Sequence, residues 1–145
     1  ASALQVELSG DASSYVVNNL FWDNEDGDLQ LRDFGTGPAS LGYVFNNNIG
    51  AMSGDIDQQA GNIHVDPQFG TAVLFLPQEG SPVADAGRSE PVPQSNPSFE
   101  SGWSYGSTDF RGRFRVQGRR VGLGALEQGP VPSLFRHGFE ANTAE

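Results

Sequence analysis

Tyr15-Val16-Val17-Asn18-Asn19 and Tyr43-Val44-Phe45-Asn46-Asn47 are the two stretches that decide the fold. Each joins a strand-forming run to paired asparagines, and the second follows the first by 28 residues. A repeat at this interval indicates a solenoid, whose coils lay each strand on the one before. Asparagine tolerates the left-handed bends between strands, and stacked amides hydrogen-bond from coil to coil. We therefore expect a ladder built from Asn18, Asn19, Asn46 and Asn47; ordinary loop asparagines are the alternative.

The composition favours short strands and tight turns over helices. The 145 residues suffice for one domain with a hydrophobic core, and they include 19 Gly and 9 Pro. No apolar pattern with a helical period extends beyond about two turns. Strands are expected at residues 4–8, 15–22 with a break at Asn18-Asn19, 29–31, 41–45 and 73–76. Strands this short, separated by turns, fit an all-β parallel solenoid of about three coils better than a sandwich.

The charge balance excludes some classes of partner. The net charge is −10, and all eight basic residues are Arg. Such a surface repels phosphate backbones, so we expect no nucleic-acid binding. The one basic cluster, within residues 111–120, either binds a phosphate or sugar acid or pairs with nearby carboxylates. We expect no membrane span, because the longest purely apolar run, residues 72–76, is too short to cross a bilayer.

Two parts of the chain are expected. Residues 1–127 would form the solenoid module, with a Pro- and Ser-rich loop at about 90–107, and residues 128–145 would form a polar tail. The sequence contains no Cys, which excludes disulfides and thiolate metal sites. No segment reads as a signal peptide, and we expect the chain to be a processed product or a fragment.

Five segments, taken in order, are similar to motifs of right-handed parallel β-helix proteins. The motif types are NSIFWGN, GNI..DP.F, GSPAIDAG, D.DG..R and VDIGAYE. The matching segments are residues 18–24, 61–69, 80–87, 109–115 and 121–127. Together they resemble the C-terminal part of bacterial choice-of-anchor Q domain proteins, which are normally much longer and have many more coils.

The resemblance implies a short right-handed parallel β-helix, of about three coils, with a loop-rich C-terminal closing segment. It implies secretion or display on a bacterial surface, and no established reaction. We therefore expect a non-catalytic structural or adhesive module. Its uncapped coil ends would be covered by upstream coils of the same protein or by another copy, which gives end-to-end self-assembly.

Some polar residues are expected to stabilise the closing segment. Asp66 precedes a proline, which keeps its backbone extended. Asp85 has the spacing of an Asx turn onto the N–H of Gly87. Asp109 and Arg115 are expected to form a charge-assisted pair that pins the final strands.

An acidic turn is the best candidate metal site. Residues 23–28 read DNEDGD, and carboxylate oxygens are the ligands that Ca²⁺ prefers. The candidate ligands are Asp23, Glu25, Asp26 and Asp28. Their order departs from that of an EF-hand loop, and a solvated acidic turn is the alternative.

An enzyme acting on polysaccharides is the rival function. Asp55 and Asp57 are two residues apart, so both would face one side of a strand, and Asp66 follows closely in the sequence. One carboxylate would act as acid and another as base in a lyase or hydrolase. A glycan-binding module without turnover is a further alternative. Five aromatic residues offer faces for sugar stacking, with core packing as the other interpretation: Tyr15, Trp22, Tyr43, Trp103 and Tyr105.

Overall fold

A computed structural model describes residues 2–36, 41–71, 73–89 and 106–128. Within these ranges the chain is all-β, as the composition predicts, and contains no helix; none of its segments could therefore cross a membrane as a helix. Most of the expected loop at 90–107 and of the expected tail at 128–145 lies outside the described residues. The strands are β1 (Leu4–Leu8), β2 (Ser13–Val17), β3 (Leu29–Asp33), β4 (Leu41–Phe45), β5 (Met52–Gly54) and β6 (Gln58–Ala60).

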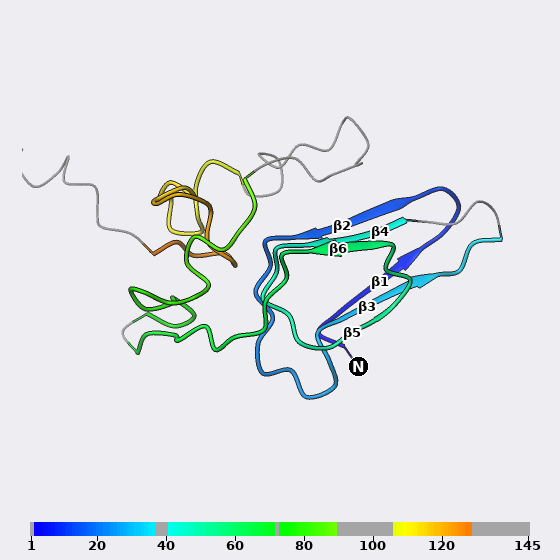
Figure 1. The fold of residues 1–145 in the computed structure, drawn as a ribbon, viewed down its shortest axis with the longest axis horizontal. Coiled ribbons are helices and arrows are strands. Elements are labelled where there is room, and N and C mark those ends of the chain that lie inside the picture. The colour runs from blue at the N-terminus through cyan, green and yellow to red at the C-terminus, as the bar shows by residue number, and fades with distance from the viewer. Residues whose placement is uncertain (1, 37–40, 72, 90–105, 129–145) are drawn as a thin grey trace, which may run out of the picture.

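The chain alternates between two parallel three-stranded sheets. One sheet has the order β1-β3-β5 and the other β2-β4-β6, as Figure 1 shows. A parallel pair needs a long crossover, and here each crossover passes through a strand of the other sheet. The sequence repeat sets the register, because Tyr15 aligns with Tyr43 and Val17 with Phe45. The prediction that the two repeats lie side by side in parallel is confirmed.

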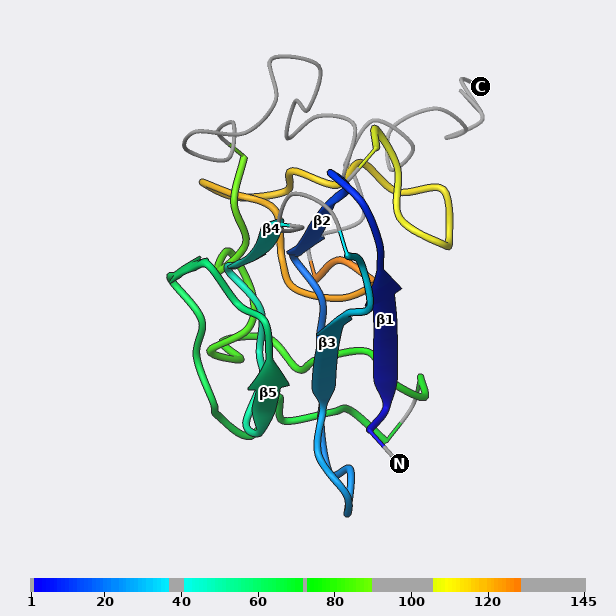
Figure 2. The ribbon, with the colours of Figure 1, turned by 90° about the vertical axis from the view of Figure 1, so that its right-hand side faces the viewer.

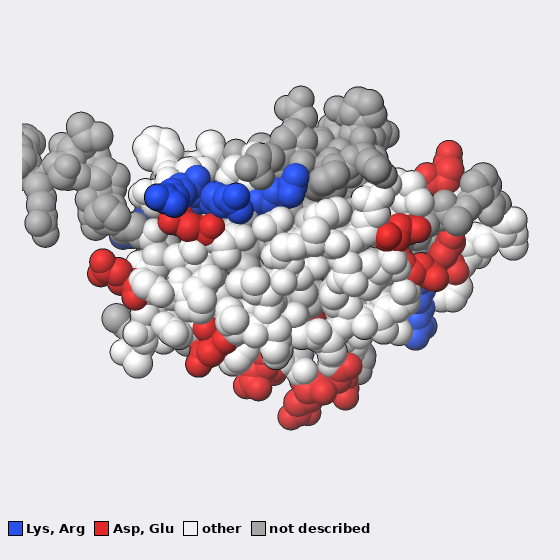
Figure 3. All heavy atoms as spheres, in the orientation of Figure 1, with Lys and Arg blue, Asp and Glu red and all other residues white. Residues whose placement is uncertain are grey.

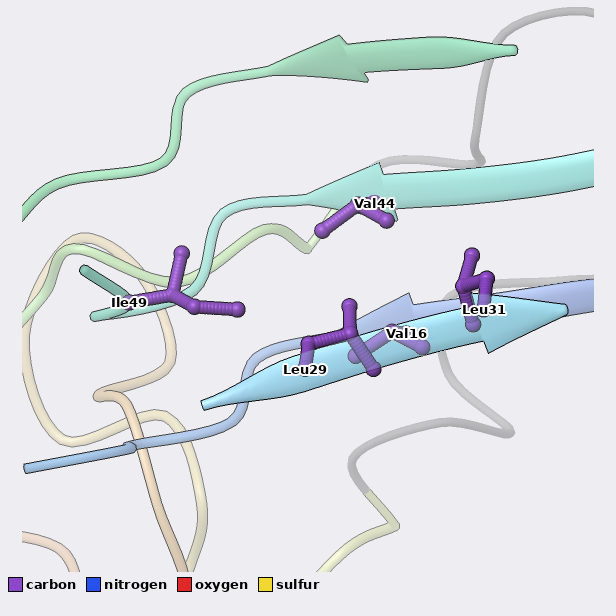
Figure 4. Packing of buried hydrophobic residues seen from close by; sticks show 5 residues of the cluster. All are labelled: Val16, Leu29, Leu31, Val44 and Ile49. Carbon is purple, nitrogen blue, oxygen red and sulfur yellow. The ribbon is translucent and has the colours of Figure 1, made fainter. Parts of the chain in front are cut away.

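The main hydrophobic core fills the space between the two sheets. Leu29 and Leu31 alternate with polar residues along β3 and point inward, where they are 1% and 0% exposed. They meet Val16 of β2 and Val44 of β4, and Ile49 closes the group after β4 (Figure 4). The two-residue period of a strand thus supplies the inner face of each sheet.

The sheet β2-β4-β6 is also apolar on its outer face. Tyr43 and Phe45 point away from the main core, and they form a second buried cluster with Val17 and the half-buried Tyr15. Because Val44 points inward between them, β4 carries three consecutive buried apolar residues. A strand that is buried on both faces reads as a continuous apolar run rather than an alternation.

One of the expected strands is wrong, and another is shorter than expected. The strand region expected at 15–22 breaks at Asn18-Asn19 as predicted, where Asn18 adopts a left-handed φ of 62°, but residues 20–22 after the break form no named strand. The strand expected at 73–76 is a turn, in which the N–H of Leu76 donates to the carbonyl of Val73 at 3.2 Å. Leu74 is 74% exposed there. An apolar run without alternation specifies no face to bury, and within the described residues this one pairs with no named strand.

The closing segment packs beside the corner that follows β2. The N–H of Leu123 donates to the carbonyl of Val83 at 3.0 Å, and that of Gly87 to Val121 at 2.8 Å. The N–H of Gly124 donates to the carbonyl of Asn18 at 3.0 Å. These bonds join two of the motif segments to each other and to the sheets, and Figure 1 shows both segments on the same side of the stack.

Candidate interface at the open sheet edges

Among the described residues, each sheet ends in strands that have a neighbour on one side only. We call the face formed by β1 and β2 the first end of the stack, and the face formed by β5 and β6 the last end. Figure 2 shows β1 at the edge of its sheet, beside β3. Parallel pairing turns alternate N–H and C=O groups outward, so an edge strand offers donors and acceptors to a further strand.

The apolar interior is incompletely covered at both ends. Leu4 and Val6 of β1 are half-buried, whereas their register partners Leu29 and Leu31 in the middle of the stack are fully buried. At the last end Met52, the register partner of Leu29, is again half-buried. At the first end Leu4 and Leu29 are the same residue type, so their difference in burial follows from the missing neighbour.

An asparagine ladder runs through the stack along one corner. The side-chain Nδ2 of Asn19 donates to Oδ1 of Asn47 at 3.1 Å, and Nδ2 of Asn47 donates to Oδ1 of Asn62 at 3.0 Å. The backbone N–H groups of Asn19 and Asn47 donate to these same two oxygens, at 2.9 and 3.0 Å. A backbone N–H requires an acceptor, so these bonds fix which amide atom is the oxygen. The ladder therefore has a direction.

The amide of Asn47 is the most enclosed of the three. Its Nδ2 also donates to the carbonyl of Val16 at 2.9 Å and to that of Phe45 at 3.1 Å, and the residue is 0% exposed. Asn62 makes the equivalent bond to the carbonyl of Val44 at 3.0 Å. The amides thus donate to backbone carbonyls near the ends of β2 and β4, and they tie the corner to both strands.

The residue before each ladder member takes the left-handed conformation. Asn18, Asn46 and Gly61 have φ of 62°, 50° and 66°. The side chains of the two asparagines bind the closing segment: Asn18 exchanges two hydrogen bonds with the backbone of Arg88, at 2.6 and 2.9 Å, and Asn46 donates to Ala86. Paired asparagines therefore divide their roles, one making the bend and the other the ladder.

The tyrosine pair packs on itself. The rings of Tyr15 and Tyr43 are stacked, with centroids 4.9 Å apart and an angle of 8° between the planes. Tyr43 is 5% exposed, so its ring offers no free face to a sugar. Two further candidates for sugar stacking, Trp103 and Tyr105, lie outside the described residues.

Trp22 lies at the rim of an acidic groove. The groove has a volume of about 570 Å³ and includes His64, whose ring centroid is 6.0 Å from that of Trp22. Asp23 and Glu25 are exposed on the same groove. Trp22 is the one described aromatic among the five candidates with a substantially exposed ring, at 37%.

The candidate calcium ligands divide into one anchored and three exposed carboxylates. Asp28 is buried, and its two oxygens accept from the N–H of Gly50 at 2.5 Å and the amide of Asn24 at 2.8 Å. Asp23, Glu25 and Asp26 are exposed. Over the ranges that the structure covers, no three His, Cys, Asp or Glu side chains are arranged to hold a metal ion.

The three candidate catalytic aspartates each accept a backbone N–H. Oδ2 of Asp55 accepts from Asp33 at 2.9 Å, and Oδ2 of Asp57 accepts from Gly42 at 2.6 Å. Both aspartates lie in the turn between β5 and β6 and tie it to the last residue of β3 and to β4. Oδ1 of Asp66 accepts from Gln68 at 2.7 Å. Along the chain, strand β6 lies between Asp66 and the other two aspartates. Because each of the three carboxylates accepts a backbone N–H, all three geometries fit stabilisation of the local backbone.

The expected pair between Asp109 and Arg115 is wrong, because each charge has another partner. Arg115 lies 3.3 Å from Glu127, and both are buried, at 5% and 3% exposed. Oδ1 of Asp109 accepts from the N–H groups of Arg111 and Arg113, both at 2.8 Å, and Oδ2 accepts from Glu127 at 3.0 Å. Glu127 in turn accepts the N–H of Gly122.

The environments of these two carboxyls shift their pKa values in opposite directions. Burial raises the pKa of Glu127 above its usual value, although the charge of Arg115 and the N–H of Gly122 oppose the shift. Burial would also raise the pKa of Asp109, but the three backbone N–H bonds from Glu127, Arg113 and Arg111 outweigh it and lower the pKa.

The expected Asx turn at Asp85 is also wrong. The N–H of Gly87 donates to Val121 and not to Asp85. Asp85 has a left-handed φ of 55°, and its Oδ1 accepts at 3.5 Å from the N–H of Arg120. The aspartate is thus turned toward the loop that precedes Val121, because its own backbone bends away from Gly87.

The arginine cluster divides between paired and exposed members. Arg111 lies 3.6 Å from Asp109, and Arg115 pairs with Glu127, whereas Arg119 and Arg120 are exposed. Figure 3 shows arginine atoms in a band along one side of this face, with acidic atoms next to part of the band. Pairing with carboxylates, the second of the two interpretations of the cluster, thus describes Arg111 and Arg115.

Sequence reasoning missed three polar residues that hold this structure together: Asn48, Asn62 and Glu127. Asn48 is 0% exposed, accepts from the N–H of Val65 at 2.9 Å and donates to the carbonyl of Phe21 at 3.2 Å. Asn62 follows a left-handed residue, as Asn19 and Asn47 do, and this Gly-Asn pair was the available signal. Glu127 carries no local signal, because its partner Arg115 comes from another turn.

Comparison with known proteins gives no relative on which to base a function. No protein-family model matches the chain, and searches of curated proteins and of solved structures return no significant match. Function must therefore be argued from the residues and the geometry.

Proposed function

We propose that this chain is a non-catalytic structural or adhesive module, built as a short right-handed parallel β-helix in an exported bacterial protein. The observation that carries the proposal is the aligned stack, in which Tyr15 lies on Tyr43 and Asn19 on Asn47. A chain that alternates between two parallel sheets and repeats its corner residues is typical of solenoids, which serve as extended scaffolds. The right hand follows the general preference of parallel crossovers.

The export and the family are supported by the sequence motifs. The segments at 80–87 and 121–127, which resemble choice-of-anchor Q domain motifs, pair with each other through Val83 and Leu123 and through Gly87 and Val121. Segments that resemble two motifs of one family and also contact one another favour a common origin. Detection of the full-length protein in the culture medium or on the cell surface, by fractionation and immunoblotting, would test export; recovery in the cytoplasm alone would contradict it.

The module would use its open ends to bind further strands. The first and last ends both expose strand edges and half-buried apolar side chains, which upstream coils or a second copy would cover. Light scattering over a wide concentration range, with negative-stain electron microscopy, tests this. We expect a mass that rises with concentration and elongated particles. A monomer at every concentration would reject self-assembly and leave upstream coils as the covering partner.

The backbone roles of the aspartates favour a scaffold over an enzyme. Asp55, Asp57 and Asp66 each accept a backbone N–H, so each has a structural task that catalysis does not require. We expect no release of reducing ends or unsaturated products from uronate-containing glycans. Product formation that is lost in Asp55→Ala and Asp57→Ala, with the fold intact by circular dichroism, would establish the enzyme instead.

Glycan binding without turnover is the second candidate, and the groove at Trp22 favours it. A partly exposed indole beside the carboxylates of Asp23 and Glu25 offers a stacking face and hydrogen-bond acceptors for sugar hydroxyls. Titration calorimetry with neutral oligosaccharides, comparing the native chain with Trp22→Ala, tests this candidate. Binding unaffected by Trp22→Ala would exclude the groove.

Calcium at the acidic turn can be tested on the same protein. Because Asp28 is engaged by Gly50 and Asn24, Ca²⁺ would rely on Asp23, Glu25 and Asp26. If the turn binds Ca²⁺, millimolar metal raises the melting temperature of the native chain more than that of Asp23→Asn/Asp26→Asn. Equal melting curves and a flat calorimetric titration would reject the site.

A further inference from the structure

We propose that copies of this chain join head to tail, with the last end of one copy on the first end of the next and Asn62 donating to Asn19 across the contact. The inference rests on the proposed self-assembly and adds its polarity and register. It follows from the direction of the asparagine ladder and from the strand alignment within one chain.

The ladder leaves different groups unused at its two ends. Within the stack, each member donates from its N–H and its Nδ2 to Oδ1 of the next member. Among the described residues, Oδ1 of Asn19 therefore accepts no hydrogen bond from a ladder member, and the N–H and one Nδ2 hydrogen of Asn62 donate to none. The first end offers an acceptor and the last end offers donors.

This polarity distinguishes the possible contacts. A first end on another first end would bring two Asn19 oxygens together, and two last ends would bring two sets of Asn62 donors together. Only the contact of a last end with a first end extends the donor–acceptor pattern of the ladder. Such a contact is heterologous and does not close on itself, so it generates linear assemblies.

The strand alignment supplies the register of the contact. Leu4 aligns with Leu29 and Leu29 with Met52, so the next copy would place its Leu4 beside Met52. By the same rule Gln5 of the next copy lies beside Ser53. The contact would bury the half-buried Leu4 and Met52, and each buried apolar square ångström contributes about 25 cal/mol.

The chain contains no Cys, which makes disulfide trapping specific. Gln5→Cys and Ser53→Cys are prepared as separate full-length proteins, because both positions are exposed and neither variant alters the core. Neighbouring strands in register place their Cα atoms at a separation that a disulfide spans. Thr71→Cys, an exposed position away from both ends, is the control.

Head-to-tail contact predicts that oxidation of the mixture gives mainly the disulfide between Cys at 5 and Cys at 53, at least about tenfold above either single protein or the Thr71→Cys mixture. Homodimers of Gln5→Cys or of Ser53→Cys would overturn the polarity while leaving self-assembly in place. Assembly by light scattering without any of these disulfides would overturn the register. A monomer without disulfides would reject both the inference and the self-assembly.

A second variant tests the ladder itself. Asn62→Asp replaces the outward donor by an acceptor but keeps the Oδ1 that accepts from Asn47. The change also removes the donor to the carbonyl of Val44, so the melting temperature of the monomer should fall, and assembly is compared at a temperature at which both proteins are folded. Under that condition we expect assembly to require at least about tenfold more protein. Unchanged assembly by Asn62→Asp, with the fold intact, would show that the ladder does not extend between copies.

Discussion

At the scale of single residues, the structure depends on asparagines at the corners. One asparagine of each pair takes the left-handed bend, and the side chain of the other hydrogen-bonds to backbone groups at the bend. Asn47 has the second of these roles. Its amide accepts from Asn19 and donates to Val16, Phe45 and Asn62, and no part of it is exposed to water. A buried amide with partners for all of these atoms stabilises one arrangement of the corner, because any other arrangement leaves groups unpaired.

Asn47→Ala should therefore lower the free energy of unfolding by about 3 kcal/mol, since it leaves the N–H of Asn19 without its acceptor and removes the side-chain bond to the carbonyl of Val16. Urea denaturation followed by circular dichroism measures the change. Asn24→Ala is the control, because Asn24 is exposed and makes one side-chain bond to Asp28, and it should cost under about 1 kcal/mol. Equal losses in the two variants would contradict the ladder.

Gly54 and Gly80 separate backbone strain from steric exclusion. Both have positive φ, of 95° and 80°. A Cβ on Gly54 would lie 1.7 Å from the carbonyl oxygen of Leu31, whereas a Cβ on Gly80 would meet nothing within 4 Å. Gly80→Ala should cost about 1 kcal/mol, the penalty of a left-handed alanine. Gly54→Ala should cost clearly more, because β5 must also move away from β3, and similar midpoints in urea would show that the strands are not so close.

The sequence predicted the ladder only where its surroundings repeat. Asn19 and Asn47 follow the same Tyr-Val prefix, so they could be recognised. Asn62 follows Gln-Ala-Gly, and nothing in that prefix resembles a buried strand. Its place is set by the register of β6 on β4, which is a property of the neighbouring strand and not of the local residues.

At the scale of elements, strands were predictable where apolar residues face a core and not where the strand is short and largely exposed. The expected strands at 4–8 and 41–45 have the observed bounds, because their apolar residues face a core. β5 and β6 have three residues each and are largely exposed, so no periodicity marks them. The apolar run at 73–76 was expected to be a strand and is a turn, because hydrophobicity alone does not provide a partner strand.

The closing segment is an element held by charges, and the sequence predicted its charged residues but not their pairing. Asp109 and Arg115 are both buried, yet each is satisfied by Glu127 in a different way: the N–H of Glu127 reaches Asp109, and its carboxylate reaches Arg115. Spacing along the chain could not reveal this, because a turn decides which charges meet. Removing one partner of a buried pair is costly, since it leaves the other charge unpaired.

Asp109→Asn tests the closing segment through pH. The lowered pKa of Asp109 means that its carboxylate stabilises the folded chain above the ordinary value of 3.8, and that this contribution is lost as the pH falls through the folded pKa. The variant places an amide N–H against the N–H of Glu127, so it should be less stable by about 1–3 kcal/mol near neutral pH.

The same variant should lose less stability than the native chain on acidification below about pH 4, because the titrating group is gone. Thermal melts at several pH values measure both effects. Glu127 acts with the opposite sign, because its raised pKa makes acidification through that pKa favour the folded state. The charge of Asp109 is one of the causes of that raised pKa, so this effect should be smaller in Asp109→Asn. Parallel stability profiles for the two proteins at low pH would contradict the assignment of the lowered pKa to Asp109.

At the scale of the whole molecule, the all-β class and the parallel stacking followed from one repeated pentapeptide, whereas the candidate sites did not follow from the sequence. Carboxylates at Asp28, Asp55 and Asp57 suggested metal binding or catalysis, and each accepts a backbone N–H: from Gly50 after β4, from Asp33 in β3 and from Gly42 in β4. The sequence shows which residues carry chemistry; whether a turn uses that chemistry depends on which backbone groups it leaves unpaired.

The stacked arrangement also decides how the molecule loosens. Of the six described strands, β3 and β4 alone are flanked on both sides, so their amides should exchange with deuterium most slowly, and those of β1, β2, β5 and β6 faster. Fraying would then proceed inward from either face, one layer at a time, as in other nearest-neighbour arrays. A chain of this kind unfolds locally from its two end strands, and the protection of the middle strands would depend on how many strands lie on either side of them.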